Sequence, residues 1–184
     1  MLELCQFADR DDCQTVIAAY ERSHTIHGAI VGDTFFDRRV MWVGSFPETE
    51  NAARRILQQW RHRATAVASL WAGQRMYSDT IQVVRWNGQA MPPHRDHRHA
   101  DGTPNPTPWR EWATIIYLND GFVGGRLIFP ETGESYDPVA GSLLLFAGDV
   151  LHSVEAAAGS PRYTAPGWFT RDATRADPWA EHHF

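Results

Sequence analysis

The stretch Met91-Pro-Pro-His-Arg-Asp-His-Arg-His99 places a histidine and an aspartate two residues apart, directly after two prolines. Pro92 and Pro93 favour an extended backbone at the entry to His94. In an extended segment, residues two apart point to the same face, so His94 and Asp96 would present an imidazole and a carboxylate side by side. The pattern therefore predicts two ligands for a metal ion, and a fold that brings a third ligand to them from elsewhere in the chain.

His152, in the segment Asp149-Val-Leu-His-Ser153, is predicted to be that third ligand. A His-x-Asp triplet alone is weak evidence in a chain with nine histidines, and a single strand histidine is often only a buried core residue. In a jelly roll, however, strands that are distant in sequence can meet at one open end of the barrel. Two histidines and one carboxylate on one side of a metal form the facial triad of non-haem Fe(II) oxygenases.

Arg162 follows His152 by one hairpin and is predicted to point into the same barrel. A buried arginine needs a partner, because an unpaired charge is expensive to remove from water. A dicarboxylate co-substrate would supply one through a bidentate guanidinium–carboxylate contact. The alternative is a surface position, since Gly159-Ser-Pro161 before it is a turn.

Composition restricts the class of protein. The 184 residues suit one domain with a substantial core, and the formal net charge of −5 argues mildly against a nucleic-acid partner. Cys5 and Cys13 fit neither a disulfide framework nor a thiolate metal site. The start of the chain lacks the pattern of a signal peptide, and no apolar run is long enough to span a membrane. We therefore expect a cytoplasmic protein without a membrane partner.

Helices are expected mainly in the first 75 residues. Asp11 and Asp12 are N-cap candidates for a short helix ending near Arg22. A longer helix is predicted from Glu48 to Trp71, with Gly73 as its stop signal. Its apolar residues recur at intervals of three and four: Ala53, Ile56, Leu57, Trp60, Ala64, Val67, Leu70 and Trp71. The arginines between them, Arg54, Arg55, Arg61 and Arg63, are interpreted as a solvated helix surface.

Short strands separated by turns dominate from Thr80 onward. The strands are expected at 81–86, 112–118, 125–130, 141–147, 150–154 and 163–170, after an earlier strand at 40–43 and a strand or loop at 28–36. The Pro- and Gly-rich segment from His99 to Trp109 is predicted to be a functional loop. Many short strands without helices between them indicate a sandwich or barrel. The fold class is therefore mostly β with N-terminal helices (α+β).

These residues resemble the prolyl 4-hydroxylase-type branch of the Fe(II)/2-oxoglutarate-dependent dioxygenases, over about half of the chain from Ile81 to Arg171. The matching features, in order, are the strand Ile81–Trp86, Gly88, His94-Arg-Asp96, the strand Ala113–Asn119 ending in Tyr-Leu-Asn, the pair Gly124-Gly125, the strand Gly141–Phe146, His152, Arg162 and Trp168. The chain departs from the family's pattern at Trp86, where tyrosine is usual, and at Arg126, where glutamate or threonine is usual.

The resemblance implies a double-stranded β-helix, which is a jelly-roll, cupin-like barrel flanked by helices. Within a single domain of residues 1–184 it implies a helical support region at 1–75, a jelly-roll catalytic core at 76–172 and a C-terminal tail at 173–184.

The resemblance also implies roles for individual residues. His94, Asp96 and His152 would hold Fe(II), and Arg162 with Thr114 would bind the co-substrate 2-oxoglutarate. Dioxygen would complete the reaction, and ascorbate is a candidate additional reductant. Further residues proposed to line the substrate pocket are Tyr117, Arg126, Trp168 and Trp86. The implied reaction is hydroxylation of an unactivated C–H bond of an amino acid, a prolyl-type peptide or a small metabolite, with release of succinate and CO2.

Two other functions stay open on the sequence alone. A cupin-like barrel can hold a metal and a dicarboxylate without turnover. An AlkB-type nucleic-acid demethylase also uses a His-x-Asp, a histidine and an arginine, but it expects a second arginine where Trp168 stands, and the acidic total disfavours nucleic acid. The expected partner is a small-molecule or peptide substrate, whose identity the sequence leaves open together with the oligomeric state.

Overall fold

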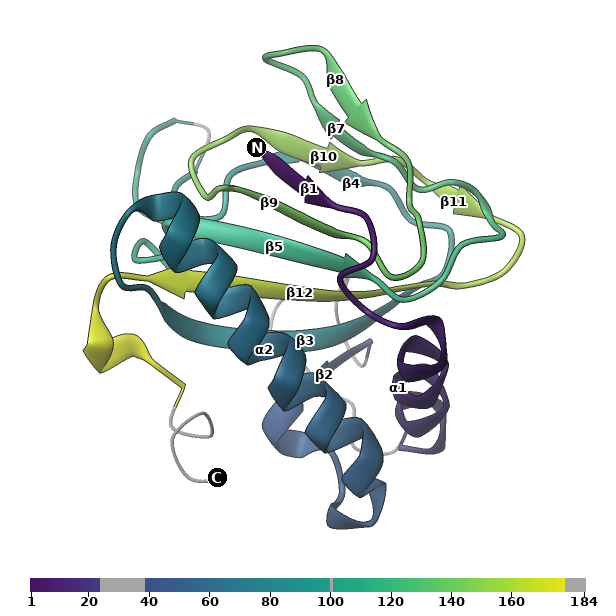
Figure 1. Ribbon diagram of the computed structural model, residues 1–184. Helices are drawn as coiled ribbons and strands as arrows, with labels where there is room; N and C mark the ends of the chain where they lie inside the picture. The colour runs from purple at the N-terminus through teal and green to yellow at the C-terminus, as the bar shows by residue number, and fades with distance from the viewer. Residues whose placement is uncertain (24–38, 100, 178–184) are drawn as a thin grey trace.

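A computed structural model describes residues 1–23, 39–99 and 101–177, so the strand or loop predicted at 28–36 lies outside the described residues. The larger sheet is antiparallel and has the strand order β1 (Leu2–Leu4), β9 (Leu143–Ala147), β5 (Trp112–Tyr117), β12 (Arg162–Thr170), β3 (Tyr77–Trp86), β2 (Val40–Trp42) (Figure 1). The second sheet has the order β4 (Met91–His94), β10 (His152–Val154), β7 (Leu127–Phe129), β8 (Glu134–Tyr136). A short ladder joins β6 (Val123–Gly124) to β11 (Ala157–Ala158).

The helices are α1 (Arg10–Arg22) and α2 (Asn51–Ala72), with single 3-10 turns at η2 (Val43–Ser45), η3 (Glu48–Glu50) and η4 (Ala173–Arg175). The prediction of a mostly β chain with helices near its N-terminus is confirmed for the described residues. None of their helices has the length and apolar character needed to cross a bilayer.

The strands expected after Thr80 all form, with ends shifted by up to a few residues. The largest difference is at β3, which begins at Tyr77 because its first residues pair with the end of β12, Thr170 with Tyr77. Turn glycines set several boundaries: Gly124 and Gly125 both have positive φ, which shortens the strand expected at 125–130 to β7. The first 75 residues also contribute β1 and β2 to the larger sheet.

The ends of the helices are set by caps. Asp9, rather than the predicted Asp11 or Asp12, caps α1: its side chain accepts a hydrogen bond from the Asp11 backbone N–H at 2.8 Å, and the two predicted residues lie in the first turn instead. Gly73 ends α2 as predicted, in the left-handed conformation with φ of 66°. The segment from Glu48 to Glu50 forms a 3-10 turn before α2 begins.

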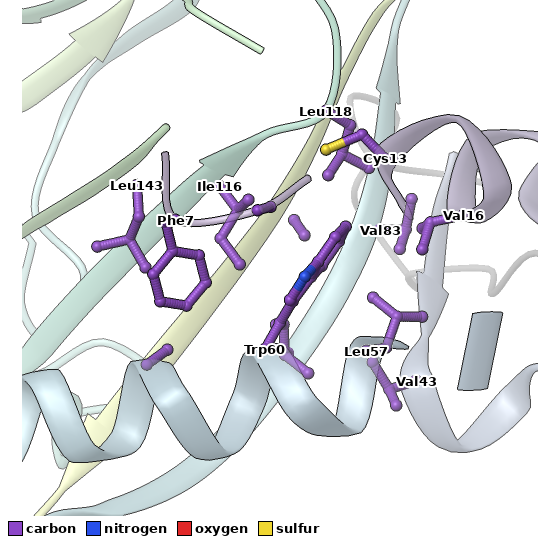
Figure 2. Close-up of a cluster of buried hydrophobic side chains, with 14 of the residues drawn as sticks. Phe7, Cys13, Val16, Val43, Leu57, Trp60, Val83, Ile116, Leu118 and Leu143 are labelled. Carbon is purple, nitrogen blue, oxygen red and sulfur yellow. The ribbon is translucent and has the colours of Figure 1, made fainter. Parts of the chain in front are cut away.

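The main hydrophobic core lies between the helices and the larger sheet, which α2 crosses (Figure 1). Trp60 extends from α2 toward side chains of the sheet, among them Ile116 and Val83 (Figure 2). The buried residues of α2 are Ala53, Leu57, Trp60, Arg61, Ala64 and Ala68. The stripe is therefore shifted from the predicted one: Leu70 is 85% exposed, because it lies about 120° around the helix from Ala64, and Trp71 in the last turn is 46% exposed.

Arg61 corrects the interpretation of a wholly solvated arginine surface, because its side chain is only 3% exposed. Its guanidinium donates to the backbone carbonyl of Ser78 at 3.2 Å and to that of Asp177 at 3.3 Å, and lies 3.5 Å from the Asp177 carboxylate. Burial lowers the pKa of Arg61, and the Asp177 charge opposes that shift. The residue thus ties α2 to β3 and to the chain that follows β12.

A second hydrophobic cluster lies between the two sheets. It contains residues from both, such as Val84, Phe146, Phe129 and Val154. The strands that carry the predicted metal ligands, β4 and β10, are neighbours in the smaller sheet. The fold therefore places the predicted site against the face of the larger sheet opposite the helices.

Candidate active site

The three predicted metal ligands meet at one point in the structure. His94 at the end of β4 is the register partner of His152 at the start of β10, and their ring centroids lie 4.2 Å apart. One potential ligand atom from each of His94, Asp96 and His152 lies within 4.8 Å of the others. Asp96 and His152 are buried, at 9% and 4% exposure. A ring of donors of this size suits one small divalent ion.

The same local hydrogen bond orients both histidine rings. His94 Nδ1 lies 3.0 Å from the Pro92 carbonyl oxygen, and His152 Nδ1 lies 3.0 Å from that of Val150. A carbonyl can only accept, so each bond requires the proton on Nδ1 and leaves the Nε2 lone pair available to a metal. Burial lowers the pKa of His152, although the Asp96 charge opposes the shift, so burial favours the neutral, metal-binding form.

A cavity of about 420 Å³ opens beside these ligands, between the two sheets. Its wall is largely apolar and aromatic. Besides the ligands, it is formed by Trp42, Gln82, Val84, Trp86, Met91, Arg95, Asn105, Thr107, Arg110, Ala113, Thr114, Ile115, Phe146, Val154, Arg162, Thr164, Pro166 and Trp168. The predicted co-substrate residues Arg162 and Thr114 therefore share one cavity with the metal ligands.

Arg162 is 1% exposed and carries a charge that the described protein leaves without an acidic partner. Its Nε, Nη1 and Nη2 are all buried without a hydrogen-bond acceptor, and so is the Tyr117 hydroxyl. The guanidinium carbon lies 4.9 Å from the centre of the Trp86 ring and 5.4 Å from that of Tyr117. Burial lowers the pKa of Arg162, and Tyr117 opposes that shift. A buried cation with unsatisfied donors on a cavity wall fits an anionic ligand.

The remaining predicted residues occupy three different positions. Trp86 and Trp168 line the cavity, and the Trp86 indole donates to Thr164 Oγ1 at 3.0 Å. Tyr117 lies behind the wall, fully buried beside Arg162. Arg126 is not brought to the cavity: its side chain is 44% exposed and forms a 3.0 Å ion pair with Glu155, because the turn at Gly124 and Gly125 directs it outward.

Several residues of the cavity wall were not predicted from the sequence. Arg110 pairs with Asp79 at 2.8 Å and its guanidinium carbon stacks 3.9 Å from the centre of the Trp168 ring. Asn105 and Thr107, from the predicted functional loop, reach the backbone of Asp96. The prolines, glycine and asparagine of that loop indicated a turn but did not reveal its partner, because the contacts join segments that sequence periodicity does not relate.

Known proteins match the part of the chain that carries these residues. Residues 81–170 match the model of the 2OG-Fe(II) oxygenase superfamily. Prolyl 3-hydroxylase 2 of Homo sapiens is 30% identical over 105 residues, which cover 50% of this chain but only 15% of that protein.

Two solved structures share the fold over most of both chains. A Pseudomonas putida prolyl-4-hydroxylase superposes with a TM-score of 0.65 at 24% identity, covering 94% of this chain and 92% of the other. A viral collagen prolyl hydroxylase from Paramecium Bursaria Chlorella virus-1 gives a TM-score of 0.65 at 18% identity, over 92% and 94% of the two chains. The matched segment is just under half of the chain and contains the His-x-Asp pair, the second histidine and the buried arginine; this segment matches the 2OG-Fe(II) oxygenase superfamily, and the chain resembles the prolyl hydroxylases.

Proposed function

We propose that this protein is a dioxygenase that depends on Fe(II) and 2-oxoglutarate and hydroxylates an unactivated C–H bond. The observation that carries the proposal is one cavity lined both by a three-donor metal set and by a buried arginine with unsatisfied donors. When bound, the iron would supply the oxidative chemistry, in which O2 and 2-oxoglutarate yield succinate, CO2 and a hydroxylated product. The protein's own contribution is to bind, orient and exclude water.

In this proposal His94, Asp96 and His152 occupy one side of the ion. Three protein donors leave the other side accessible from the cavity, as a catalytic metal requires. The two Nδ1 hydrogen bonds keep both imidazoles in one orientation. The buried Asp96 carboxylate compensates part of the ion's charge in a region of low dielectric constant.

Arg162 would bind the distal carboxylate of 2-oxoglutarate. Its guanidinium offers a planar set of donors that matches a carboxylate, and Tyr117 packs against it from behind the cavity wall. Thr114 and Thr164 contribute hydroxyl groups to the same wall. The Trp86 indole already donates to Thr164, so it fills space beside Arg162 rather than contacting the co-substrate.

We further propose that the two sheets are the halves of a double-stranded β-helix, a jelly-roll barrel. The order of strands, the cavity between the sheets and the similarity to prolyl hydroxylase structures support this interpretation. The division into a supporting region at 1–75, a catalytic core at 76–172 and a tail at 173–184 belongs to the same proposal. The core contains every ligand assigned here.

The substrate is proposed to be an amino acid, a prolyl-type peptide or a small metabolite. The relatives named as prolyl hydroxylases support the second of these. The apolar wall, with Trp42, Trp86 and Trp168, suits a ring or aliphatic group at the reacting end. The binding-only cupin and the AlkB-type demethylase are the competing functions, and the comparisons favour neither.

Succinate formation from 2-oxoglutarate tests the proposal. Purified protein with Fe(II), ascorbate and O2 should release succinate, and a +16 Da product should appear for one member of a panel of free amino acids, proline-containing peptides and small metabolites. Methylated oligonucleotides belong in the same panel. Metal and 2-oxoglutarate binding without succinate under any condition would support the binding protein instead, and release of formaldehyde from the oligonucleotides would support the demethylase.

A further inference from the structure

We propose that Asn105 and Thr107 are positioning residues that fix the metal ligand Asp96, an inference that rests on the proposed function. The Asn105 side-chain amide donates to the Asp96 backbone carbonyl at 2.8 Å. Thr107 Oγ1 lies 3.1 Å from the same oxygen. Two side chains from a loop of the cavity wall thus converge on one carbonyl of a metal ligand.

The backbone on the other side of Asp96 is held as well. The Asp96 N–H donates to the Gly148 carbonyl oxygen at 2.9 Å, from the turn that precedes β10. The Asp96 Cα therefore lies between two peptide groups that are each hydrogen-bonded to a different segment. Since the directions of these peptide groups determine the direction of Cβ, the contacts aim the carboxylate at the two histidines.

Close packing leaves this backbone little room to move. The Gly148 N–H donates to the Glu111 carbonyl at 2.8 Å, and a Cβ added at Gly148 would lie 2.2 Å from the carbonyl oxygen of Arg110. The turn that precedes β10 and the chain that leads to β5 are therefore in direct backbone contact beside Asp96. Asn105 and Thr107 complete the enclosure from the cavity side.

The segment Asn105–Arg110, here called the strap, is anchored at its far end too. The Arg110 N–H donates to the Thr107 carbonyl at 3.2 Å. The Arg110 guanidinium stacks on Trp168 at 3.9 Å and pairs with Asp79 at 2.8 Å, both on the larger sheet. The strap therefore joins the metal ligand on one side of the cavity to the aromatic wall on the other.

Such an arrangement makes metal affinity depend on residues that do not touch the metal. Without the two donors, the Asp96 carbonyl loses its partners and the carboxylate samples other directions. Loss of groups that orient metal ligands commonly weakens metal binding by about 10- to 100-fold. A residue that only stabilised the loop would lower the melting temperature and leave the affinity of the folded protein for metal unchanged.

The test is calorimetric titration of the whole protein with Mn²⁺ alone, which requires no substrate and no turnover. Thr107→Val removes the hydroxyl with little change in shape, and Asn105→Ala removes the amide. Each variant should raise the dissociation constant of Mn²⁺, and the double variant should raise it by about 10- to 100-fold. Thr107→Ser, which keeps the hydroxyl, should restore the wild-type value.

Two controls separate positioning from general stability. Thr103→Val alters the same loop, but the hydroxyl that it removes donates to the Asp101 side chain at 2.7 Å and not to Asp96. Asn119→Ala removes an amide that bonds to the backbone of Pro161 and Tyr163, on either side of Arg162, and not to Asp96. Both should leave the Mn²⁺ affinity unchanged at temperatures where the protein is folded. Wild-type affinity in the folded double variant would overturn the positioning role alone, whereas a wild-type protein that binds no Mn²⁺ would overturn the metal centre and the positioning role together.

Discussion

His94 and His152 are direct register partners across the β4–β10 ladder, with ring centroids 4.2 Å apart. Strand pairing, rather than loop conformation, therefore sets the spacing between two of the three proposed metal ligands. A one-residue slip of β10 would turn His152 to the opposite face of its sheet and remove it from the site. These two ligands are thus as rigid as the sheet that carries them.

Removing any one of the three ligands should abolish metal-dependent turnover. His94→Ala, Asp96→Ala and His152→Ala are each expected to eliminate succinate formation and to weaken Mn²⁺ binding, because two donors do not hold the ion in place. Circular dichroism and thermal melting should show that the sheets persist. His62→Ala, on the exposed side of α2, is the matched control and should keep full activity.

Arg162→Ala should raise the concentration of 2-oxoglutarate needed for half-maximal succinate formation. Loss of a charge-assisted hydrogen bond costs about 1.5–3 kcal/mol, which corresponds to roughly a 10- to 100-fold rise in KM. Arg126→Ala removes an arginine that pairs with Glu155 at the surface, and it should leave this value unchanged. Equal KM values for wild type and Arg162→Ala would contradict the co-substrate assignment.

Gly125→Ala should displace the Arg162 side chain and so weaken the proposed co-substrate site. A Cβ at Gly125 would lie 3.0 Å from Arg162 Cδ and 2.9 Å from a ring carbon of Phe122, at a φ of +74°. Gly133 has the same φ, but a Cβ there meets nothing within 4 Å. Both substitutions should cost about 1–2 kcal/mol of unfolding free energy from backbone strain. Only Gly125→Ala should also raise the KM for 2-oxoglutarate; an equal effect at both positions would disprove the link to Arg162.

Cys13 should be unreactive in the folded protein. Burial, reinforced by the charge of Asp12, raises the pKa of this thiol from its ordinary value of 9.0 to about 12. Cys5, by contrast, is exposed. One thiol per chain should react with a disulfide reagent at pH 8 and two in denaturant, with Cys5→Ser abolishing the native reaction. A raised pKa contributes stability that is present below pH 9 and is lost as pH rises toward 12, so Cys13→Ala should flatten this part of the stability profile.

The two faces of α2 should respond differently to truncation. Trp60 is 1% exposed and packs between α2 and the larger sheet, so Trp60→Ala should cost about 3–5 kcal/mol of unfolding free energy (Figure 2). Leu70 is 85% exposed, and Leu70→Ala should change it by less than about 0.5 kcal/mol. Chemical denaturation of both variants measures the difference. Similar losses would mean that the buried stripe runs where the apolar residues of the sequence suggested.

Local features of the structure followed well from the sequence. The alternation and turn residues after Thr80 predicted β3, β5, β9 and β12 of the larger sheet and β7 and β10 of the smaller one, because side-chain period and turn chemistry are properties of neighbouring residues. The strands β1, β4 and β8 were not predicted. Gly73 ended its helix for the same reason. The His-x-Asp pair, His152 and Arg162 were identified because their residue types and order carry specific chemistry.

Features that depend on distant partners were predicted less well. Arg61 was interpreted as solvated, yet it is buried, because its partner Asp177 comes from the other end of the described chain. Arg126 was assigned to the pocket, yet two consecutive glycines of positive φ direct it to Glu155 at the surface. Asn105 and Thr107 were unnoticed, since their target is a backbone carbonyl that any residue would present.

The sequence by itself therefore determined which residues can hold a metal and a dicarboxylate, and the approximate positions of the strands that carry His152 and Arg162. Only the tertiary structure decided that these residues share one cavity and that Arg162 has no acidic partner among the described residues. It also decided which groups orient the Asp96 carboxylate. The physical reason is range: backbone propensity and side-chain chemistry are set within a few residues, whereas burial and hydrogen-bond partners depend on which segments the folded sheets bring together.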